Sequence, residues 1–128
     1  MSINDIGKEG ERMARSILKD WFRVDNIFQA DWLIKKNDSY YVVEVKHKDM
    51  FRPPPFYGHG LDIRQVKARM AFMRETGIRC MFLVIDTDGR VFWQWLDVLE
   101  KGRHIDTKNG IRVYAIEGFK KMRRRMTG

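Results

Sequence analysis

The chain has 128 residues, 44% of them hydrophobic and 12% aromatic, which is enough to form one folded domain, residues 1–128, with a buried core. Its formal net charge of +8 favours a polyanionic partner, although a membrane surface would satisfy the same electrostatics. No segment approaches the roughly 18 consecutive apolar residues that span a bilayer, and the amino terminus lacks a signal-peptide core, so we expect a cytoplasmic protein and neither a membrane nor a secreted one.

The first predicted helix runs from about Asn4 or Asp5 to about Phe22. Its apolar residues fall on one broad arc, and Glu11 lies almost in line with Leu18, at the edge of this arc. A salt bridge to a neighbouring basic residue is the alternative for Glu11. Basic residues recur at spacings of three and four and form a stripe that could contact phosphates, with a solvated helix face as the equally weighted alternative: Lys8, Arg12, Arg15 and Lys19.

Residues 31–46 are predicted to form a hairpin of two antiparallel strands, with a turn at 36–39. Successive side chains of a strand point to opposite faces, so Glu44 and Lys46 project together from one face of the second strand. The valines beside them point to the other face, which we expect to be buried. Because the hairpin folds back on itself, it carries Asp31 towards Glu44.

Asp31 and Glu44 are therefore candidate ligands of one divalent metal ion. Two carboxylates, a backbone carbonyl and waters make an all-oxygen site, which suits magnesium or manganese rather than zinc. Such an ion would polarise a phosphodiester and lower the pKa of a bound water, while Lys46 could orient that water or neutralise charge developing on phosphorus. The pattern indicates metal-assisted phosphodiester hydrolysis. The alternative is an ordinary ion pair of Glu44 and Lys46 on a solvated strand, worth only about 0–1 kcal/mol.

The joint order of three motifs resembles the PD-(D/E)XK nuclease superfamily, specifically its archaeal-type Holliday junction resolvases. Residues 7–12 look like the opening G-x-x-x-E-R on the first helix, Asp31 matches the first metal carboxylate, and residues 44–46 match the E-V-K motif, while Ala30 stands where the superfamily name has proline. The resemblance covers roughly residues 5–86. It implies an α/β fold with a restriction-endonuclease-like core, in which helices flank a central mixed sheet. It also implies magnesium-dependent cleavage and a homodimer that nicks two strands of a four-way junction symmetrically.

The segment from Asp49 to Gly60 is predicted to be a proline-containing loop, longer than a compact resolvase would have. It follows the E-V-K strand directly, so it should lie beside the metal site. We expect it to contact nucleic acid, with Arg52 on a phosphate and Tyr57 or Phe56 wedging or stacking at a distorted point. A loop packed on its own aromatic residues is an equally weighted alternative.

The second predicted helix begins near Asp62 and ends near Gly77. Gln65 and Arg69 lie one turn apart on it, and related nucleases often place a polar Q-x-x-x-Y pair here to support the active site, so Arg69 replaces the tyrosine. We expect Gln65 to be a catalytic or supporting residue, with a surface amide as the alternative, and Arg69 to contact DNA. The apolar stripe of this helix comprises Ile63, Val66, Met70 and Met73.

A buried strand through Ile85 and a second strand from Val91 to Leu96 are predicted to form another hairpin. Cys80 lies in the first strand, where a buried structural thiol is expected, and it offers neither a disulfide nor a zinc cluster. Trp93 and Trp95 share one face of the second strand. Core or dimer interface is the favoured interpretation of this pair, and stacking on unpaired bases is the alternative.

The last third of the chain, residues 90–128, extends past the resemblance. A turn at Asn109 and Gly110 followed by a strand over 111–116 predicts a further hairpin. The basic end at 118–128 extends the phosphate-contacting area or forms a solvated helix end.

We therefore expect a nuclease in which Asp31 and Glu44 bind Mg²⁺, for which Mn²⁺ substitutes, with the Val45 carbonyl as a further ligand. Lys46 positions the attacking water, and Glu11 assists a metal ion or the substrate geometry. The favoured substrate is branched DNA, chiefly a four-way junction, and small size with basic charge suits a phage-encoded protein. Two alternatives stay open: a less selective nuclease of the same superfamily acting on duplex, flap or single-stranded DNA, and an inactive DNA-binding module.

Overall fold

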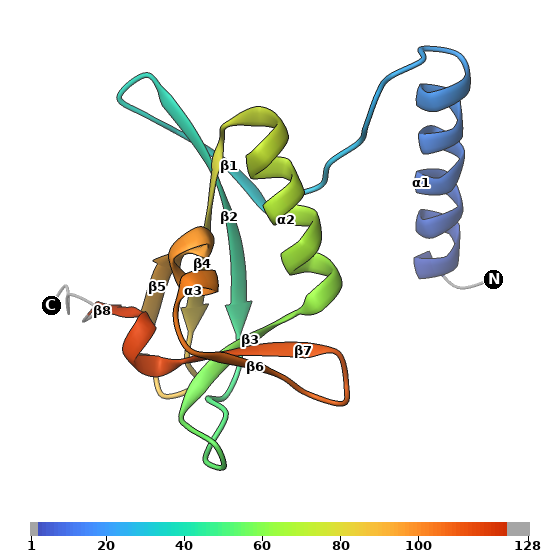
Figure 1. Ribbon diagram of the computed structural model, residues 1–128. Coiled ribbons are helices and arrows are strands. Elements are labelled where there is room, and N and C mark those ends of the chain that lie inside the picture. The colour runs from blue at the N-terminus through green and yellow to red at the C-terminus, as the bar shows by residue number, and fades with distance from the viewer. Residues whose placement is uncertain (1–2, 123–128) are drawn as a thin grey trace, which may run out of the picture.

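The computed structural model describes residues 3–122, and the side chains of its first helix from residue 7 onward. Two sheets organise the chain (Figure 1): a five-stranded sheet in the order β1-β2-β4-β5-β8 and a three-stranded sheet in the order β3-β7-β6. The elements are α1 (Ile3–Asp20), β1 (Trp32–Lys36), β2 (Ser39–His47), β3 (Gly58–Asp62), α2 (Ile63–Thr76), β4 (Arg79–Ile85), β5 (Val91–Trp95), α3 (Leu96–Lys101), β6 (His104–Asp106), β7 (Ile111–Ala115), the 3-10 turn η1 (Ile116–Gly118) and β8 (Lys120–Met122).

The five-stranded sheet is mixed, because β2 and β4 run parallel while the other neighbouring pairs are antiparallel. The predicted first hairpin is confirmed: β1 and β2 pair in the register that puts Trp32 opposite Val43. In the parallel pair Glu44 lies opposite Phe82, so the E-V-K segment is paired with β4 on one side. The expected α/β architecture, with helices beside a central mixed sheet, is therefore confirmed.

The core lies between this sheet, α2, α3 and the smaller sheet. Alternate residues of β2, β4 and β5 point into it, and they are almost fully buried with their partners: Val42, Phe82, Val84, Phe92, Val66, Leu96, Leu99 and Tyr114. Burying a large apolar side chain stabilises a protein by about 1.5–3 kcal/mol, so this cluster supplies most of the driving force that holds α2 against the sheet. Cys80 belongs to the same cluster, as expected of a structural thiol.

The ends of α2 lie where the sequence predicts them. Asp62 caps the first turn, because its Oδ1 accepts a hydrogen bond of 2.8 Å from the backbone N–H of Arg64. Gly77 ends the helix in the left-handed conformation, with φ of 74°, and its N–H donates to the carbonyl of Met73. These two caps set the ends of α2, and the packing of Val66 and Met70 on the core sets its rotation.

The prediction of a loop over residues 49–60 is wrong at its carboxyl end. Gly58 and Gly60 belong to β3 and are buried against β7, where a Cβ on Gly58 would collide with the Tyr114 carbonyl. These glycines permit close packing of two strands rather than flexibility. Phe56 is also buried and packs with Val113 and Ala115, so it is not free to wedge into DNA. Phe56 therefore packs on β7 and not on the aromatic residues of its own loop, which was the alternative.

Helix α1 confirms the predicted first helix but stands apart from the rest of the chain (Figure 1). An extended segment joins it to β1, and every residue from 7 to 20 is exposed. Residues 120–122 of the basic end form β8 rather than a helix end, and residues 123–128 lie outside the described part. Within residues 3–122, no helix combines the length and the apolar character that crossing a membrane requires.

Candidate active site

A cavity of about 540 Å³ opens between the start of β1, the middle of β2 and the first half of α2. It brings together four of the residues singled out in the sequence, two from the hairpin and two from α2. Its lining consists of Phe28, Gln29, Ala30, Asp31, Glu44, Gln65 and Arg69. Asp31 and Glu44 thus meet in one place, as the hairpin predicts.

Asp31 is held by the backbone of the neighbouring strand. The pairing of β1 with β2 ends at Trp32 and Val43, which leaves the next part of β2 without a strand partner from β1. The Asp31 side chain takes this place, because its Oδ2 accepts a hydrogen bond of 3.0 Å from the Val45 N–H. One oxygen of the Asp31 carboxylate is therefore fixed against the E-V-K segment, and its position follows directly from the hairpin register.

Glu44 is a buried acid, with only 2% of its surface exposed. Its Oε1 accepts a charge-assisted hydrogen bond from Nε of Arg69, which is itself 7% exposed. Burial raises the pKa of Glu44, the adjacent Arg69 guanidinium opposes this, and the nearby Asp31 carboxylate raises the pKa further. The side chain is therefore both desolvated and held in one orientation by a residue of α2.

The two carboxylates carry like charges in one cavity, so each opposes ionisation of the other, and Asp31 raises the pKa of Glu44. A cation bound between them would relieve this repulsion. Hard oxygen donors are what Mg²⁺ and Mn²⁺ prefer, and Mg²⁺ usually keeps several waters and takes only one or two carboxylates. Among the described side chains of residues 7–122, no three His, Cys, Asp or Glu residues form a metal-binding group.

Lys46 lies two residues beyond Glu44 on the same face of β2 and is partly buried. Lys48 follows at the end of the strand, where its Nζ donates a 2.6 Å hydrogen bond to the Gly60 carbonyl. Burial lowers the pKa of Lys48, and the charge of Lys46 lowers it further. A second positive charge thus lies close to Lys46, while Lys48 is committed to holding β3 in place.

The structure does not bring Glu11 to this cavity. Glu11 lies on the exposed helix α1, as do the three basic residues expected to contact phosphates, Lys8, Arg12 and Arg15. Arg12 forms a surface ion pair with Glu9 at 3.2 Å. The role of Glu11 therefore stays a prediction that requires α1 to move.

Arg69 also departs from its expected role. We expected it to contact DNA, but its guanidinium is buried and paired with Glu44. Its position on the helix shows why: Arg69 lies three residues after Val66 and four before Met73, on the apolar face of α2. A charged residue within an apolar stripe is a signal for a buried ion pair, and this signal was available in the sequence.

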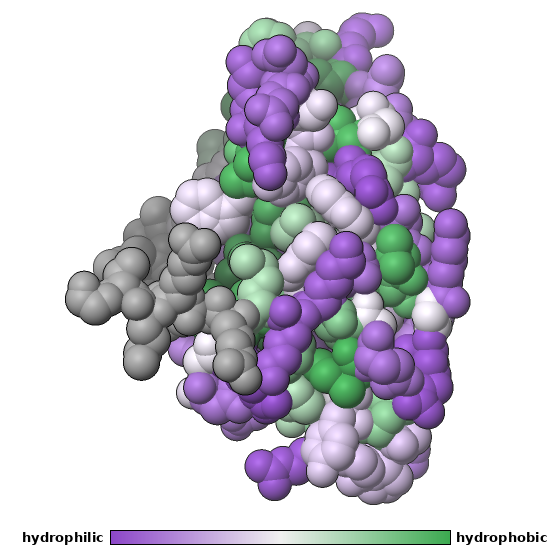
Figure 2. Space-filling view, turned by 90° about the vertical axis from the view of Figure 1, so that its left-hand side faces the viewer, coloured by the Kyte–Doolittle hydropathy of each residue, from purple (hydrophilic) through white to green (hydrophobic). Residues whose placement is uncertain are grey.

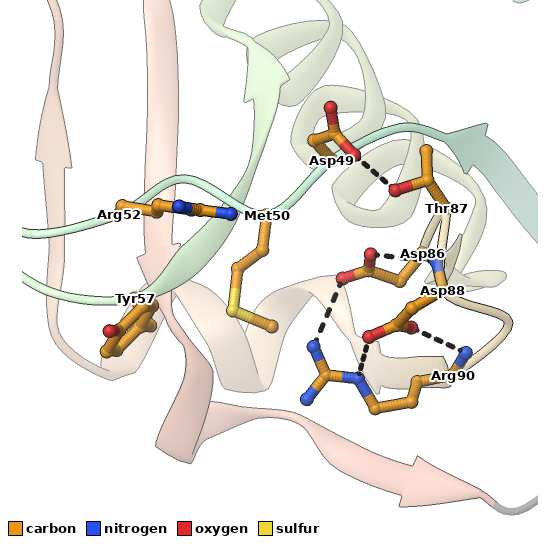
Figure 3. Close-up of a pocket in the computed structure, with 8 residues that line it drawn as sticks. All are labelled: Asp49, Met50, Arg52, Tyr57, Asp86, Thr87, Asp88 and Arg90. Carbon is orange, nitrogen blue, oxygen red and sulfur yellow. Dashed lines mark hydrogen bonds and ion pairs between the residues drawn. The ribbon is translucent and has the colours of Figure 1, made fainter.

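Arg52 and Tyr57 line a different pocket, of about 320 Å³, at the carboxyl ends of β2 and β4 (Figure 3). Three aspartates take part in its lining, and they are engaged by other residues. Arg90 pairs with Asp88 at 2.6 Å and with Asp86 at 3.8 Å, while Thr87 donates its hydroxyl to Asp49. The pocket is thus an ion-pair network with Arg52 and Tyr57 at its side, and neither residue lines the cavity of Asp31 and Glu44.

The sequence did not single out Phe28 and Gln29, which complete the wall of the cavity. The ring of Phe28 packs edge-on against Phe72 of α2, with 5.1 Å between the ring centroids. This contact ties the segment before Asp31 to α2. A single aromatic residue three positions before Asp31 carries no periodic pattern, so only the fold reveals its place.

Comparison with known proteins does not assign the chain to a family. No family model matches the chain, and no curated protein matches it. Among solved structures, Hjc of Archaeoglobus fulgidus, a Holliday junction resolvase from an archaeal hyperthermophile, is similar with 14% sequence identity and a TM-score of 0.49. The alignment covers 86% of this chain and 86% of that one.

Proposed function

We propose that this chain is a magnesium-dependent DNA endonuclease formed as a single domain with a restriction-endonuclease-like core. The observation that carries the proposal is the meeting of the Asp31 and Glu44 carboxylates in one cavity, with Lys46 on the same face of the strand as Glu44. Two carboxylates and a lysine around a bound metal ion are the groups that phosphodiester hydrolysis uses. The order of the three sequence motifs supports the same reaction.

Asp31, Glu44 and the Val45 carbonyl would hold Mg²⁺, for which Mn²⁺ substitutes. When bound, the ion would supply polarisation of the phosphodiester and a more acidic water. The hydrogen bond from Val45 N–H keeps Asp31 in place, and Arg69 keeps Glu44 in one orientation. Lys46 would orient the attacking water, and Gln65, which lines the cavity from α2, would position the water or the phosphate through its amide.

The proposed substrate is branched DNA, chiefly a four-way junction, cut by a homodimer. A dimer with two equivalent sites matches a junction that must be nicked on two strands, and the net charge of +8 suits binding to phosphates. Lys8, Arg12 and Arg15 on α1 and Arg52 beside β2 are the proposed phosphate contacts, and Tyr57, which is 53% exposed, is the aromatic residue available for stacking.

The test compares cleavage of labelled four-way junction, flap, linear duplex and single-stranded DNA, with Mg²⁺ or with EDTA. We expect paired symmetric nicks near the junction centre, lost in EDTA and in Asp31→Asn. The matched control is Asp38→Asn, which removes an exposed carboxylate from the turn of the same hairpin and should leave cleavage unchanged.

Each other outcome has a definite meaning. Equal cutting of all substrates, still lost in Asp31→Asn, would keep the metal site and replace the resolvase by a less selective nuclease. Tight DNA binding without cleavage in Mg²⁺ and in Mn²⁺ would contradict the nuclease and leave an inactive DNA-binding module.

A further inference from the structure

Helix α1 presents an apolar surface that no other described element covers closely. The exposed side chains include two aromatic residues just after the helix, Trp21 at 83% and Phe22 at 71%, and three aliphatic ones, Met13, Ile17 and Leu18. At spacings of three, four and five residues they share one broad arc of the helix. The basic residues lie on the opposite side. A helix of this kind is stable in water chiefly when its apolar arc packs on a partner.

The five-stranded sheet presents a second apolar surface, here called the open face. In each strand, alternate residues point into the core on the side of α2 and α3, and the residues between them point to the opposite face. This opposite face is the open face. Its residues line a groove of about 930 Å³. The half-buried apolar residues of the groove include Tyr41, Met81, Leu83, Trp93 and Trp95, and the exposed Met122 lies at its side. Figure 2 views the side that carries β5 and β8, and hydrophobic residues there lie open between charged ones.

The connection between helix and sheet holds α1 away from the open face of its own chain. Phe28 packs on Phe72 of α2, and Asp31 is bound to Val45, so the segment leaves the sheet on the side of α2. Accordingly α1 stands beyond α2 in Figure 1. To reach its own open face, the helix would have to pass around the edge strand β1. The open face of another copy requires no such passage.

We propose that two copies of this chain exchange their first helices, so that the apolar arc of each α1 packs in the groove on the open face of the other copy. The inference deepens the proposed homodimer by naming its interface, and it depends on neither DNA nor metal. Exchange of one identical element gives a closed two-fold dimer. An aromatic side chain buries roughly 150–250 Å², so two helices and two grooves reach the roughly 1,200–2,000 Å² of a stable interface.

The charges of both surfaces agree with this arrangement. With the apolar arc in the groove, Lys8, Arg12 and Arg15 point outward from each end of the dimer and remain available to phosphates. The rim of the groove carries its own polar residues, with Arg79 stacked on Trp95 at 4.3 Å from the ring centroid and paired with Asp97 at 3.0 Å. The groove therefore has the apolar centre and polar rim of a protein interface.

The first experiment measures the mass of the full chain by sedimentation, without DNA and without metal. We expect a dimer, and we expect Trp21→Glu to halve the sedimenting mass, because it places a charge in the apolar arc. Trp21 is almost fully exposed in the single chain, so this substitution removes no contact that folds the protein, and far-UV circular dichroism should not change.

The second experiment identifies the occupant of the groove by a cysteine pair. Chains carrying Ile17→Cys and chains carrying Leu83→Cys are co-expressed with different tags and mildly oxidised. The proposal expects a disulfide-linked heterodimer. The control Ser16→Cys, on the polar side of the same helix turn, should give no link with Leu83→Cys. Cys80 is fully buried and does not compete.

Three outcomes overturn the proposal. A link formed within one chain of the double variant, in a monomer, assigns the groove to the chain's own helix. A dimer that forms no Ile17–Leu83 link, and that Trp21→Glu leaves intact, places the interface elsewhere. A monomer without any link leaves the groove free, and loss of single-stranded DNA binding in Trp93→Ala but not in Trp21→Glu would then make it a base-stacking surface. Absence of nuclease activity would contradict the proposed function but would not change any of these results on the dimer.

Discussion

The Nε–H of Arg69 on α2 donates to Oε1 of Glu44 on β2, and both side chains are almost completely buried. The contact joins the central strand to the helix that covers it. A buried carboxylate without a partner is costly, so the position of α2 and the ionised state of Glu44 depend on each other. The candidate metal site is thus also a structural contact of the fold.

The pair predicts a large and specific loss of stability. Arg69→Met leaves Glu44 buried without its counter-charge and should lower the free energy of unfolding at pH 7 by about 3–5 kcal/mol. The double variant Glu44→Gln with Arg69→Met should recover most of this loss, since no unpaired charge remains. Urea unfolding of both variants tests this, and a loss below about 1 kcal/mol in the single variant would contradict it.

Lys46 should affect the rate of cleavage and not the binding of metal. If it positions the attacking water, Lys46→Met should reduce the cleavage rate by roughly 100–1,000-fold, the range for loss of one group that stabilises developing charge. Magnesium affinity, measured by calorimetry, should stay within about threefold, because Asp31 and Glu44 remain. Lys36→Met, at the exposed end of β1, is the matched control. Equal losses of cleavage rate in the two variants would mean that Lys46 contributes only positive charge and does not position the water.

Cys80 should be inert in the folded protein. Its thiol is fully buried among core residues, and burial raises its pKa to about 12. Since only the thiolate reacts with alkylating reagents, iodoacetamide at pH 8 should modify Cys80 only as fast as the chain unfolds, and completely in urea. Mass spectrometry measures the rate of modification. Rapid modification under native conditions would contradict the prediction and show that β4 is accessible.

His59 should make the protein less stable as the pH falls. Its ring is fully buried, Nε2 lies 3.2 Å from Asp86, and burial lowers its pKa despite the opposing effect of the Asp86 carboxylate. Below the ordinary histidine pKa of about 6.5 the unfolded chain binds a proton that the folded chain does not, so stability is fully present above this pH and declines below it, by at most about 1.4 kcal/mol per pH unit.

The control for this effect is His59→Gln, whose amide can still donate to Asp86. Its unfolding free energy should vary less between pH 7.5 and pH 5.5 than that of the unsubstituted chain, because the variant lacks His59. His47 and His104 are present in both proteins, so their effects cancel in the comparison. Identical pH dependence in the two proteins would mean that His59 keeps its ordinary pKa.

Local signals predicted the hairpins and α2 because each depends on a few neighbouring residues. Asp62 and Gly77 mark the ends of α2 by capping, and the turn after β1 sets the register that brings Asp31 to Glu44. What the sequence did not predict depends on distant partners. The strand β3 contains two glycines and has little β propensity of its own, so it exists only because it packs against β7.

The candidate site shows the same division. Alternation along β2 places Glu44 and Lys46 on one face without knowledge of the fold. The place of Arg69 within the apolar stripe of α2 indicates burial, but the identity of its partner, Glu44, depends on how α2 docks on the sheet. The position of Glu11 depends on where α1 packs, and this is decided by surfaces outside the helix. Interactions between distant segments are therefore the part that sequence patterns leave open.

The parallel pairing of β2 with β4 determines when the candidate site can form during synthesis. The two strands are separated by the whole crossover through β3 and α2, so they cannot pair with each other until the chain has been made as far as Ile85. A nascent chain that ends at Asp62 already contains Asp31 and Glu44, but it lacks the helix that neutralises one and walls in the other. An incomplete chain would thus carry both acids without the cavity in which they lie beside Gln65 and Arg69.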